Sequence, residues 1–338
     1  MDTLTHALSG ALLARATAPK EAPAGSLKRR IAAGFLACAS PDLDIVIFLF
    51  GPLAYMENHR GVTHSLVLLP LWALLYSWIL AKILREPRGW RALFGITAMS
   101  LALHITGDVI TTYGTMILAP LSRWRAQIGT TFIIDLWFSG IIVAGLAASA
   151  VLRRSRWPAA AGCAMLAAYV GFQYLQREKA AGFGERYARE QGLRGTKVNV
   201  QPRPVSPFNW TVFVSDAEAH RFAHVNLVRK APPQSREDDA FIAKLDSVYE
   251  PLASAHWTTR SRYGEGAEAA PAREAWNSDA MAPYRWFADL PAYDGISAGA
   301  TCVWFIDLRF DSPGRGTQPF RYGACRDQPG ASWRLVPP

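Results

Sequence analysis

The sequence has little charge, few cysteines and no repeats, and each of these absences excludes a class of protein. Only 19% of its 338 residues are charged, against about a quarter in an average globular protein. This low charge content excludes an intrinsically disordered chain and a coiled coil. The four cysteines include no Cys-x-x-Cys pair, which excludes a zinc ribbon and a thioredoxin-type motif. No segment of about 20–50 residues repeats, so the chain is not a solenoid.

The first half of the chain instead contains a series of apolar segments. A helix needs about 20 predominantly apolar residues to cross a bilayer. Three segments meet this length clearly, a fourth carries His104 and Asp108, and two are short or interrupted. In chain order, the six candidates are residues 4–18, 31–50, 62–84, 93–118, 132–152 and 157–175. We therefore predict an all-α polytopic membrane domain of about six hydrophobic segments over residues 1–176.

The formal net charge of +9 is unevenly distributed along the chain. Residues 1–178 contain 16 Lys and Arg against 9 Asp and Glu, and the excess lies in short loops between apolar segments. Such loops orient a protein in a bacterial inner membrane, whereas a nucleic-acid binder carries its charge across a folded face. We expect the lipid bilayer as a partner and no nucleic acid. Placing loops 15–30, 82–91 and 153–156 in the cytoplasm gives a multi-pass protein with both termini extracytoplasmic. The opening residues lack a signal peptide's basic region and cleavage site, so we expect them to be retained.

The composition changes after residue 175. Residues 177–200 predict a juxtamembrane helix and linker, and residues 201–338 a small soluble α+β domain on the outer face. Apolar and aromatic patterning predicts strands at 210–215, 220–228, 301–310 and 319–323, and helices at 238–249 and 273–287. In an oxidising compartment Cys302 and Cys325 could pair, although two unrelated buried thiols fit the sequence equally well.

Histidine and aspartate recur in four short motifs of the apolar half. The motifs are Thr5-His6, PDLD at 41–44, HRGVTH at 59–64 and HITGD at 104–108. The predicted topology brings their polar side chains to one level in the outer half of the membrane, with His104 one turn deeper. The residues at this level are His6, Asp42, Asp44, His59, His64, Asp108 and Asp135.

These residues predict a metal site. His104 and Asp108 are four residues apart and share one face of a helix. Asp42 and Asp44 are two apart, so one of them is expected to bind the ion and the other to orient a ligand or end a helix. Alone, each motif could be structural: His6 as a packing residue, Asp42 as a cap, HRGVTH as a polar loop. Together they favour a metal ion, because ionisable groups in a membrane cost about 2.5–3.5 kcal/mol each and are usually paired or functional.

The ligand types indicate the ion, and nearby arginines indicate a substrate. Histidine and carboxylate without cysteine suit Zn²⁺, and also Mn²⁺ or Fe²⁺. Arg60, Arg123 and Arg125 lie in the predicted outer loops, where a guanidinium group can bind phosphate oxygens. The alternative is a contact with solvent or lipid headgroups.

The motifs, in this order, resemble the bacterial membrane-bound metal-dependent hydrolases typified by the YdjM inner-membrane protein. MDTLTHALSG, SPDLD, HRGVTHS, HITGD with TTYGT, and FIIDLW carry the resemblance over residues 1–140. PFNW at 207–210 looks like the start of the soluble tail of longer members. That family is held to be distantly related to zinc-dependent phospholipases C and single-strand nucleases, which are helical phosphodiesterases.

This resemblance implies a ligand set. His6, one of Asp42 and Asp44, His64 or His59, and the pair His104 and Asp108 correspond to ligands of the soluble enzymes, whose first-residue amine is also a ligand. Position 114 is Gly where those enzymes have another His, and their later ligands have no counterpart before the soluble domain. The resemblance therefore implies one or two ions, with Asp108 as the candidate bridge.

The leading prediction from these residues is a membrane-embedded metal-dependent hydrolase of a phosphoester, such as a phospholipid. A metal-bound hydroxide would attack phosphorus at the outer side of the membrane, with catalytic roles for Asp42, Asp44 and Asp108. Arg60, Arg123, Arg125 and Asp135 would support the ligands or bind phosphate. Two alternatives stay open: an ion or proton transporter that uses intramembrane His and Asp, and a regulatory membrane protein with a structural metal.

Overall fold

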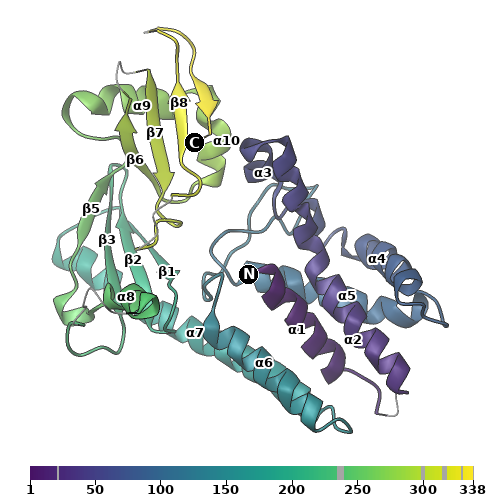
Figure 1. Cartoon of the computed structure of the whole chain (residues 1–338). Helices are drawn as coiled ribbons and strands as arrows, with labels where there is room; N and C mark the ends of the chain where they lie inside the picture. Colours follow the sequence, from purple (N-terminus) through teal and green to yellow (C-terminus); the bar gives the residue numbers. More distant parts are fainter. Residues whose placement is uncertain (21–22, 234–239, 298–300, 314–317, 329, 338) are drawn as a thin grey trace. The chain divides into compact units, whose positions relative to one another are not determined.

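The computed structural model describes residues 1–20, 23–233, 240–297, 301–313, 318–328 and 330–337. The chain divides into two compact units (Figure 1). The helical unit comprises Met1–Gly51 and Asn58–Leu175, and the second unit comprises Pro52–Glu57 and Gln176–Pro338.

The helical unit consists of helices of 14 to 19 residues joined by irregular segments, together with the start of a longer helix. Helix α1 begins behind the N-cap Asp2, whose carboxylate accepts a hydrogen bond from the Thr5 N–H at 3.0 Å. The elements are α1 (Thr3–Ala16), α2 (Ala24–Ala39), η1 (Ser40–Phe50), η2 (Val62–His64), α4 (Leu69–Ile83), α5 (Arg91–Val109), α6 (Leu136–Val151) and α7 (Trp157–Glu190). Helix α7 starts in this unit and continues into the second, and the short α3 (Pro52–Asn58) lies almost entirely in the second unit.

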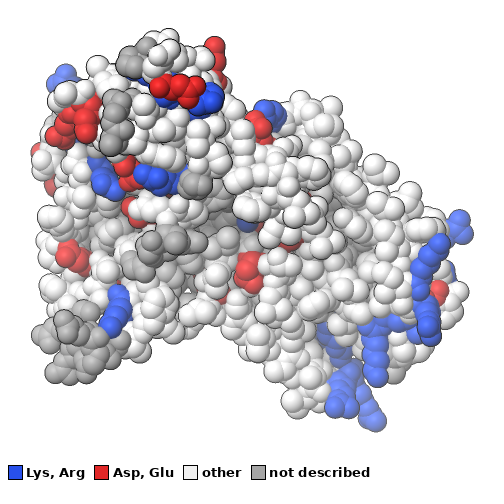
Figure 2. Space-filling view, turned by 45° about the horizontal axis from the view of Figure 1, so that its top comes forward, with Lys and Arg blue, Asp and Glu red and all other residues white. Residues whose placement is uncertain are grey.

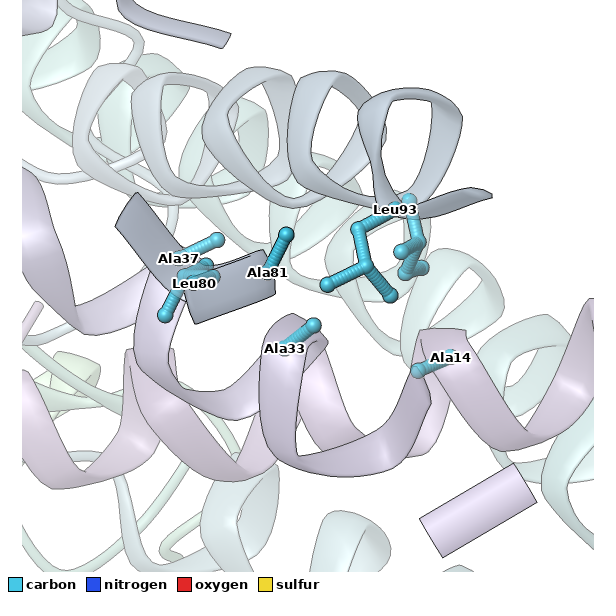
Figure 3. Close-up of a cluster of buried hydrophobic side chains, with 7 residues drawn as sticks. Ala14, Ala33, Ala37, Leu80, Ala81 and Leu93 are labelled. Atoms are coloured by element: carbon cyan, nitrogen blue, oxygen red, sulfur yellow. The ribbon is translucent and has the colours of Figure 1, made fainter. Parts of the chain in front are cut away.

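Small side chains let these helices pack closely. A Cβ added to Gly10 of α1 would lie 2.1 Å from the Gly34 carbonyl oxygen of α2, so only glycine fits there. Further along the same interface, alanines of α1 and α2 meet the side chains of α4 and α5 in a buried cluster (Figure 3). The cluster contains Ala14, Ala33, Ala37, Leu80, Ala81, Leu93 and Ile96. Close approach through small residues is the usual way that helices associate in membranes.

The prediction of about six membrane-crossing segments is not supported. Among the described residues, two helices are long and apolar enough to span a bilayer, Gly25–Phe50 and Arg91–Val109. A third candidate is a pair of helices, Pro52–His64 and Leu69–Ile83, bent by 82°. Lys and Arg side chains gather at one end of the helical unit, and much of its remaining visible surface is uncharged (Figure 2).

The other predicted segments fall short for identifiable reasons. Helix α1 has 14 residues and α6 has 16, both below the length that a full crossing needs. The predicted span at 62–84 is broken after η2, and the one at 93–118 stops being helical at Val109. The apolar part of α7 is rich in alanine and interrupted by Gln173, so its mean hydropathy is too low for a candidate membrane span.

The second unit contains two sheets. The first has the order β1 (Lys197–Pro202), β2 (Asn209–Ser215), β3 (Ala219–Asn226) and β4 (Glu250–Pro251), with β5 (Thr258–Ser261) also paired to β3. All pairs are antiparallel except β3 with β4. The second sheet is antiparallel throughout, in the order β6 (Pro291–Ile296), β7 (Cys302–Asp307), β8 (Tyr322–Cys325) and β9 (Arg334–Val336). The short helices α8 (Phe241–Ser247), α9 (Ala269–Asn277) and α10 (Ala282–Phe287) belong to this unit, in addition to α3 and the last part of α7.

Each of the four predicted strands overlaps an observed one, namely β2, β3, β7 and β8. The predicted helix at 238–249 contains α8, although residues 238 and 239 lie outside the described part of the chain. The predicted helix at 273–287 overlaps α9 and α10, which Ser278–Met281 separates because Ser278 adopts an extended conformation. Cys302 and Cys325 are directly opposite each other on β7 and β8 and form a disulfide.

Candidate metal centre

The PDLD motif directly follows α2 and forms the start of η1. Pro41 occupies the first turn of η1, where its missing N–H costs nothing. The two aspartates of the motif differ in their surroundings. The Asp44 carboxylate accepts hydrogen bonds from the His59 Nδ1–H at 2.8 Å, the Arg60 backbone N–H at 2.9 Å and the Thr63 hydroxyl at 3.2 Å. These three hydrogen bonds show that Asp44 holds the HRGVTH loop in place.

The HRGVTH loop turns sharply before η2 and directs His64 inward. Arg60 has a positive φ of 57°, an uncommon conformation for a residue other than glycine. The Met116 N–H donates to the Arg60 carbonyl at 2.9 Å, and together with Asp44 this bond fixes the loop on both sides. His64 is fully buried at the end of the loop.

Helix α5 supplies His104 and Asp108, which are one turn apart and both fully buried. Gly107 lies between them and leaves room for His6 of α1, because a Cβ at this position would be 3.0 Å from His6 Cε1. His6 Nε2 is 3.1 Å from Asp108 Oδ1, and the His6 and His104 rings stack at 3.8 Å. The sequence spacing thus places an imidazole and a carboxylate on one helical face, against the first helix.

Four side chains converge on one point in the helical unit: Asp42, His64, His104 and Asp108. His64 Nε2 lies 2.9 Å from His104 Nε2, 3.1 Å from Asp108 Oδ2 and 3.8 Å from Asp42 Oδ1. His104 Nε2 lies 3.4 Å from Asp108 Oδ2 and 3.6 Å from Asp42 Oδ1. Ligands about 2.1 Å from a tetrahedral zinc ion are about 3.4 Å from one another, so these separations suit one ion.

The hydrogen bonds behind the two imidazoles determine which nitrogen carries the proton. The Cys38 carbonyl lies 2.6 Å from His104 Nδ1 and can only accept, so Nδ1 is the donor and Nε2 keeps its lone pair. The Thr63 hydroxyl donates to Asp44 and lies 2.9 Å from His64 Nδ1, so the same assignment follows for His64. Within the described part of the chain, Asp42 Oδ2 and Asp108 Oδ2 accept no hydrogen bond. With these assignments, the atoms that face one another here are acceptors, as in a cation site.

Asp108 is also the centre of a cluster of buried positive and polar groups. The Arg60 guanidinium is 2.9 Å from Asp108 Oδ1, and the Met1 amino group is 2.5 Å from the same oxygen. Arg60 also donates to the Thr111 hydroxyl at 3.0 Å and stacks over the Tyr113 ring at 4.9 Å. One carboxylate oxygen thus balances a buried guanidinium, while the other faces the two imidazoles.

Two residues predicted to support the site contact other parts of the helical unit. Asp135 caps α6, accepting from the Trp137 and Phe138 N–H groups at 2.9 Å. Arg125 stacks over Tyr113 at 5.4 Å and donates to the Tyr113 carbonyl. His59, predicted as a possible ligand, is instead bonded through Nδ1 to Asp44.

The sequence analysis did not identify several residues that surround the four donors. They are Cys38, Thr63, Thr111 and Tyr113. Thr63 stands beside His64 within the HRGVTH motif, and this position could have suggested its role. Thr111 and Tyr113 belong to the TTYGT run that follows HITGD, whereas no motif included Cys38.

Two buried histidines of the second unit, His220 and His224, define a pH response. Burial, followed by the charge of Arg203, lowers the pKa of His224 to about 3, and burial also lowers the pKa of His220. Both residues have a pKa of about 6.5 in an unfolded chain. Below this pH the unfolded chain therefore binds protons that the folded unit does not, and stability falls as the pH decreases.

We expect this unit to be about 2 kcal/mol less stable at pH 5 than at pH 7 through His224 alone. Urea denaturation of the full chain in detergent measures the difference, with cleavage of the second unit by a protease as the readout of its unfolding. His224→Asn should reduce it, whereas His256→Asn, at an exposed histidine, should not. An equal pH dependence in all three proteins would contradict this account.

The apolar helices and the buried His and Asp side chains define a membrane protein with a candidate metal centre. A sequence profile of the family described as YdjM inner membrane protein matches residues 1–180, more than half of the chain. The chain belongs to this family, which confirms the resemblance inferred from its motifs.

A curated relative and the solved structures complete the comparison. The chain is 28% identical over 181 residues to "Uncharacterized protein YfhP" of Bacillus subtilis (strain 168). The match covers 52% of this chain and 54% of that protein, so the chain spans about half the length of this relative. No solved structure matches the chain.

Proposed function

We propose that the protein is a membrane-embedded metal-dependent hydrolase that acts on a phosphoester at the outer side of the membrane. The observation that carries the proposal is the convergence of four His and Asp ligand atoms on one point, next to a buried guanidinium. Asp42, His64, His104 and Asp108 would hold the ion. Two nitrogen and two oxygen donors suit Zn²⁺, and also Mn²⁺ or Fe²⁺.

A bound ion of this kind acts as a Lewis acid toward a phosphoryl oxygen and activates water. The residues of the chain would supply the remaining functions. Arg60 carries a fixed positive charge 2.9 Å from Asp108, where it can neutralise charge that develops on a phosphoryl group. Asp44 already accepts three hydrogen bonds, so its role is to orient His59 and His64.

The exposure of the donors indicates the side from which a substrate would approach. The Asp42 side chain is 12% exposed, whereas those of His64, His104 and Asp108 are fully buried. A phosphoester would therefore reach the centre past Asp42. This residue comes from η1, whose outer side chains, among them Phe48 and Leu49, are exposed and apolar.

A second candidate function is a structural metal site. Four protein ligands complete a tetrahedron, whereas catalytic zinc sites usually have three and keep one position for water or substrate. In that case the ion would stabilise the helical unit without any reaction.

Metal analysis of the purified protein, combined with an assay on a chromogenic phosphodiester and on phospholipid vesicles, tests the proposal. We expect one or two ions per wild-type chain with measurable hydrolysis, and the loss of both in Asp42→Asn. Asp135→Asn is the matched control, since Asp135 lies outside the group and asparagine also caps helices well. Tightly bound metal without hydrolysis of any probe would favour the structural ion. A well-folded wild type without metal would remove the proposal.

A further inference from the structure

A second group of potential ligands lies beside the first and contains sulfur. His6 of α1, Cys38 of α2 and His104 of α5 each offer one ligand atom, and these atoms lie within 4.8 Å of one another. All three residues are buried, with exposures of 2% for His6 and 0% for the other two. Three potential ligands from three different helices therefore meet in the interior of the helical unit.

The packing of α1 on α2 fixes the position of the thiol. A Cβ built on Gly10 would lie 2.4 Å from the Cys38 Cβ, so the Cys38 side chain directly faces the backbone of α1. His6 is one turn before Gly10 on the same helix. The close approach that glycine permits thus brings the thiol and the His6 imidazole together.

The hydrogen bonds of His6 leave one nitrogen able to bind an ion. His6 Nε2 lies 3.1 Å from Asp108 Oδ1, and because an ionised carboxylate only accepts, Nε2 carries the proton. The His6 lone pair is then on Nδ1. His104 donates through Nδ1 to the Cys38 carbonyl, so its lone pair is on Nε2.

The two groups share His104 but prefer different metals. Asp42, His64, His104 and Asp108 provide two oxygen and two nitrogen donors, which suit hard and borderline ions. His6, Cys38 and His104 provide two nitrogens and a thiolate, which suit soft ions such as Cu⁺ and Cd²⁺. His104 has one available lone pair, so it can bind an ion of one group at a time.

We propose that His6, Cys38 and His104 form a second metal site, which binds a soft ion and displaces the ion of the four-residue group through their shared histidine. The Cys38 thiol releases its proton to solvent when the soft ion binds. The displacement rests on the proposed metal centre, whereas the sulfur-containing site does not. A soft metal would therefore inhibit the proposed hydrolase.

Titration of the metal-free full chain in detergent with Cd²⁺ tests the site, since cadmium–thiolate bonds absorb in the ultraviolet. We expect the absorption in the wild type and in Cys163→Ser, which removes the other free cysteine. Cys38→Ser should abolish it, and His6→Gln should weaken Cd²⁺ binding. Asp42→Asn should retain it, because Asp42 belongs only to the other group. No absorption in the wild type, or absorption that depends on Cys163 instead, would overturn the site.

Electron paramagnetic resonance of Mn²⁺ tests the displacement. Mn²⁺ bound to the wild type should return to the free-ion signal when one equivalent of Cd²⁺ is added, and it should stay bound in Cys38→Ser. Retention of Mn²⁺ while the cadmium–thiolate absorption develops would overturn the displacement. If no hard or borderline ion binds to the wild type, the proposed function is wrong. The Cd²⁺ titration would still decide whether the sulfur-containing site exists.

Discussion

Asp108→Asn is expected to lower the free energy of unfolding of the helical unit by about 3–5 kcal/mol, even when a chelator keeps all metal away. The variant leaves the Arg60 guanidinium, which is 2% exposed, without the carboxylate 2.9 Å from it. An unpaired charge in the interior is costly because it has lost its hydration without gaining a partner. Denaturation of the purified full chain in detergent measures the loss.

A double variant separates this charge effect from other consequences of the substitution. Arg60→Met removes the guanidinium and keeps an unbranched side chain, so Asp108→Asn should cost much less in its presence. We expect a coupling free energy of about 2 kcal/mol or more between the two positions. Asp135→Asn, at a buried aspartate that contacts no arginine among the described residues, should cost less. Additive effects of the two single variants would show that Arg60 does not depend on Asp108.

Gly10→Ala is expected to lower the stability of the helical unit by about 3 kcal/mol, at the upper end of the usual cost of overpacking. The new Cβ would lie 2.1 Å from the Gly34 oxygen and 2.4 Å from the Cys38 Cβ. Neither neighbour can move easily, because one is backbone and the other is a Cβ on a packed helix. Helix α1 must therefore shift away from α2. Thermal denaturation in detergent measures the change.

Gly140→Ala provides the control for helix propensity. Gly140 lies in α6, and none of the described residues lies within 4 Å of an added Cβ there. Alanine is the better helix former by about 1 kcal/mol, so this variant should be neutral or more stable. Equal effects of the two substitutions would mean that the close contact of α1 and α2 does not limit stability.

Local spacing was sufficient to predict part of the candidate centre. The HxxxD motif depends only on the period of the helix, and α5 presents His104 and Asp108 together. The spacing of PDLD predicted that only one aspartate would join the ligands. The sequence could not choose between them, because the choice depends on which carboxylate meets the donors of the HRGVTH loop. That meeting is a tertiary contact between residues 15 to 19 positions apart.

Other features were beyond sequence reasoning for similar reasons. Apolar length suggested six spans, but it cannot show where a helix breaks, as at residues 65–68, or ends, as at Val109. The spacing of Cys38 could not indicate a site, since His6 and His104 are 32 and 66 residues away in the sequence. Strands β2, β3, β7 and β8 were predictable from their β-branched and aromatic residues. The short strands β4 and β9, of two and three residues, carry no comparable pattern.

The four donors come from η1, η2 and α5, so a bound ion connects three elements that are separated along the chain. An ion that binds only the folded chain adds its binding free energy to the stability of the fold. Cells continuously degrade proteins that unfold, and a change of about 1–2 kcal/mol can alter abundance several-fold. Under the proposed function, the supply of the metal would therefore determine how many copies of this protein a cell retains, as well as how many of them are active.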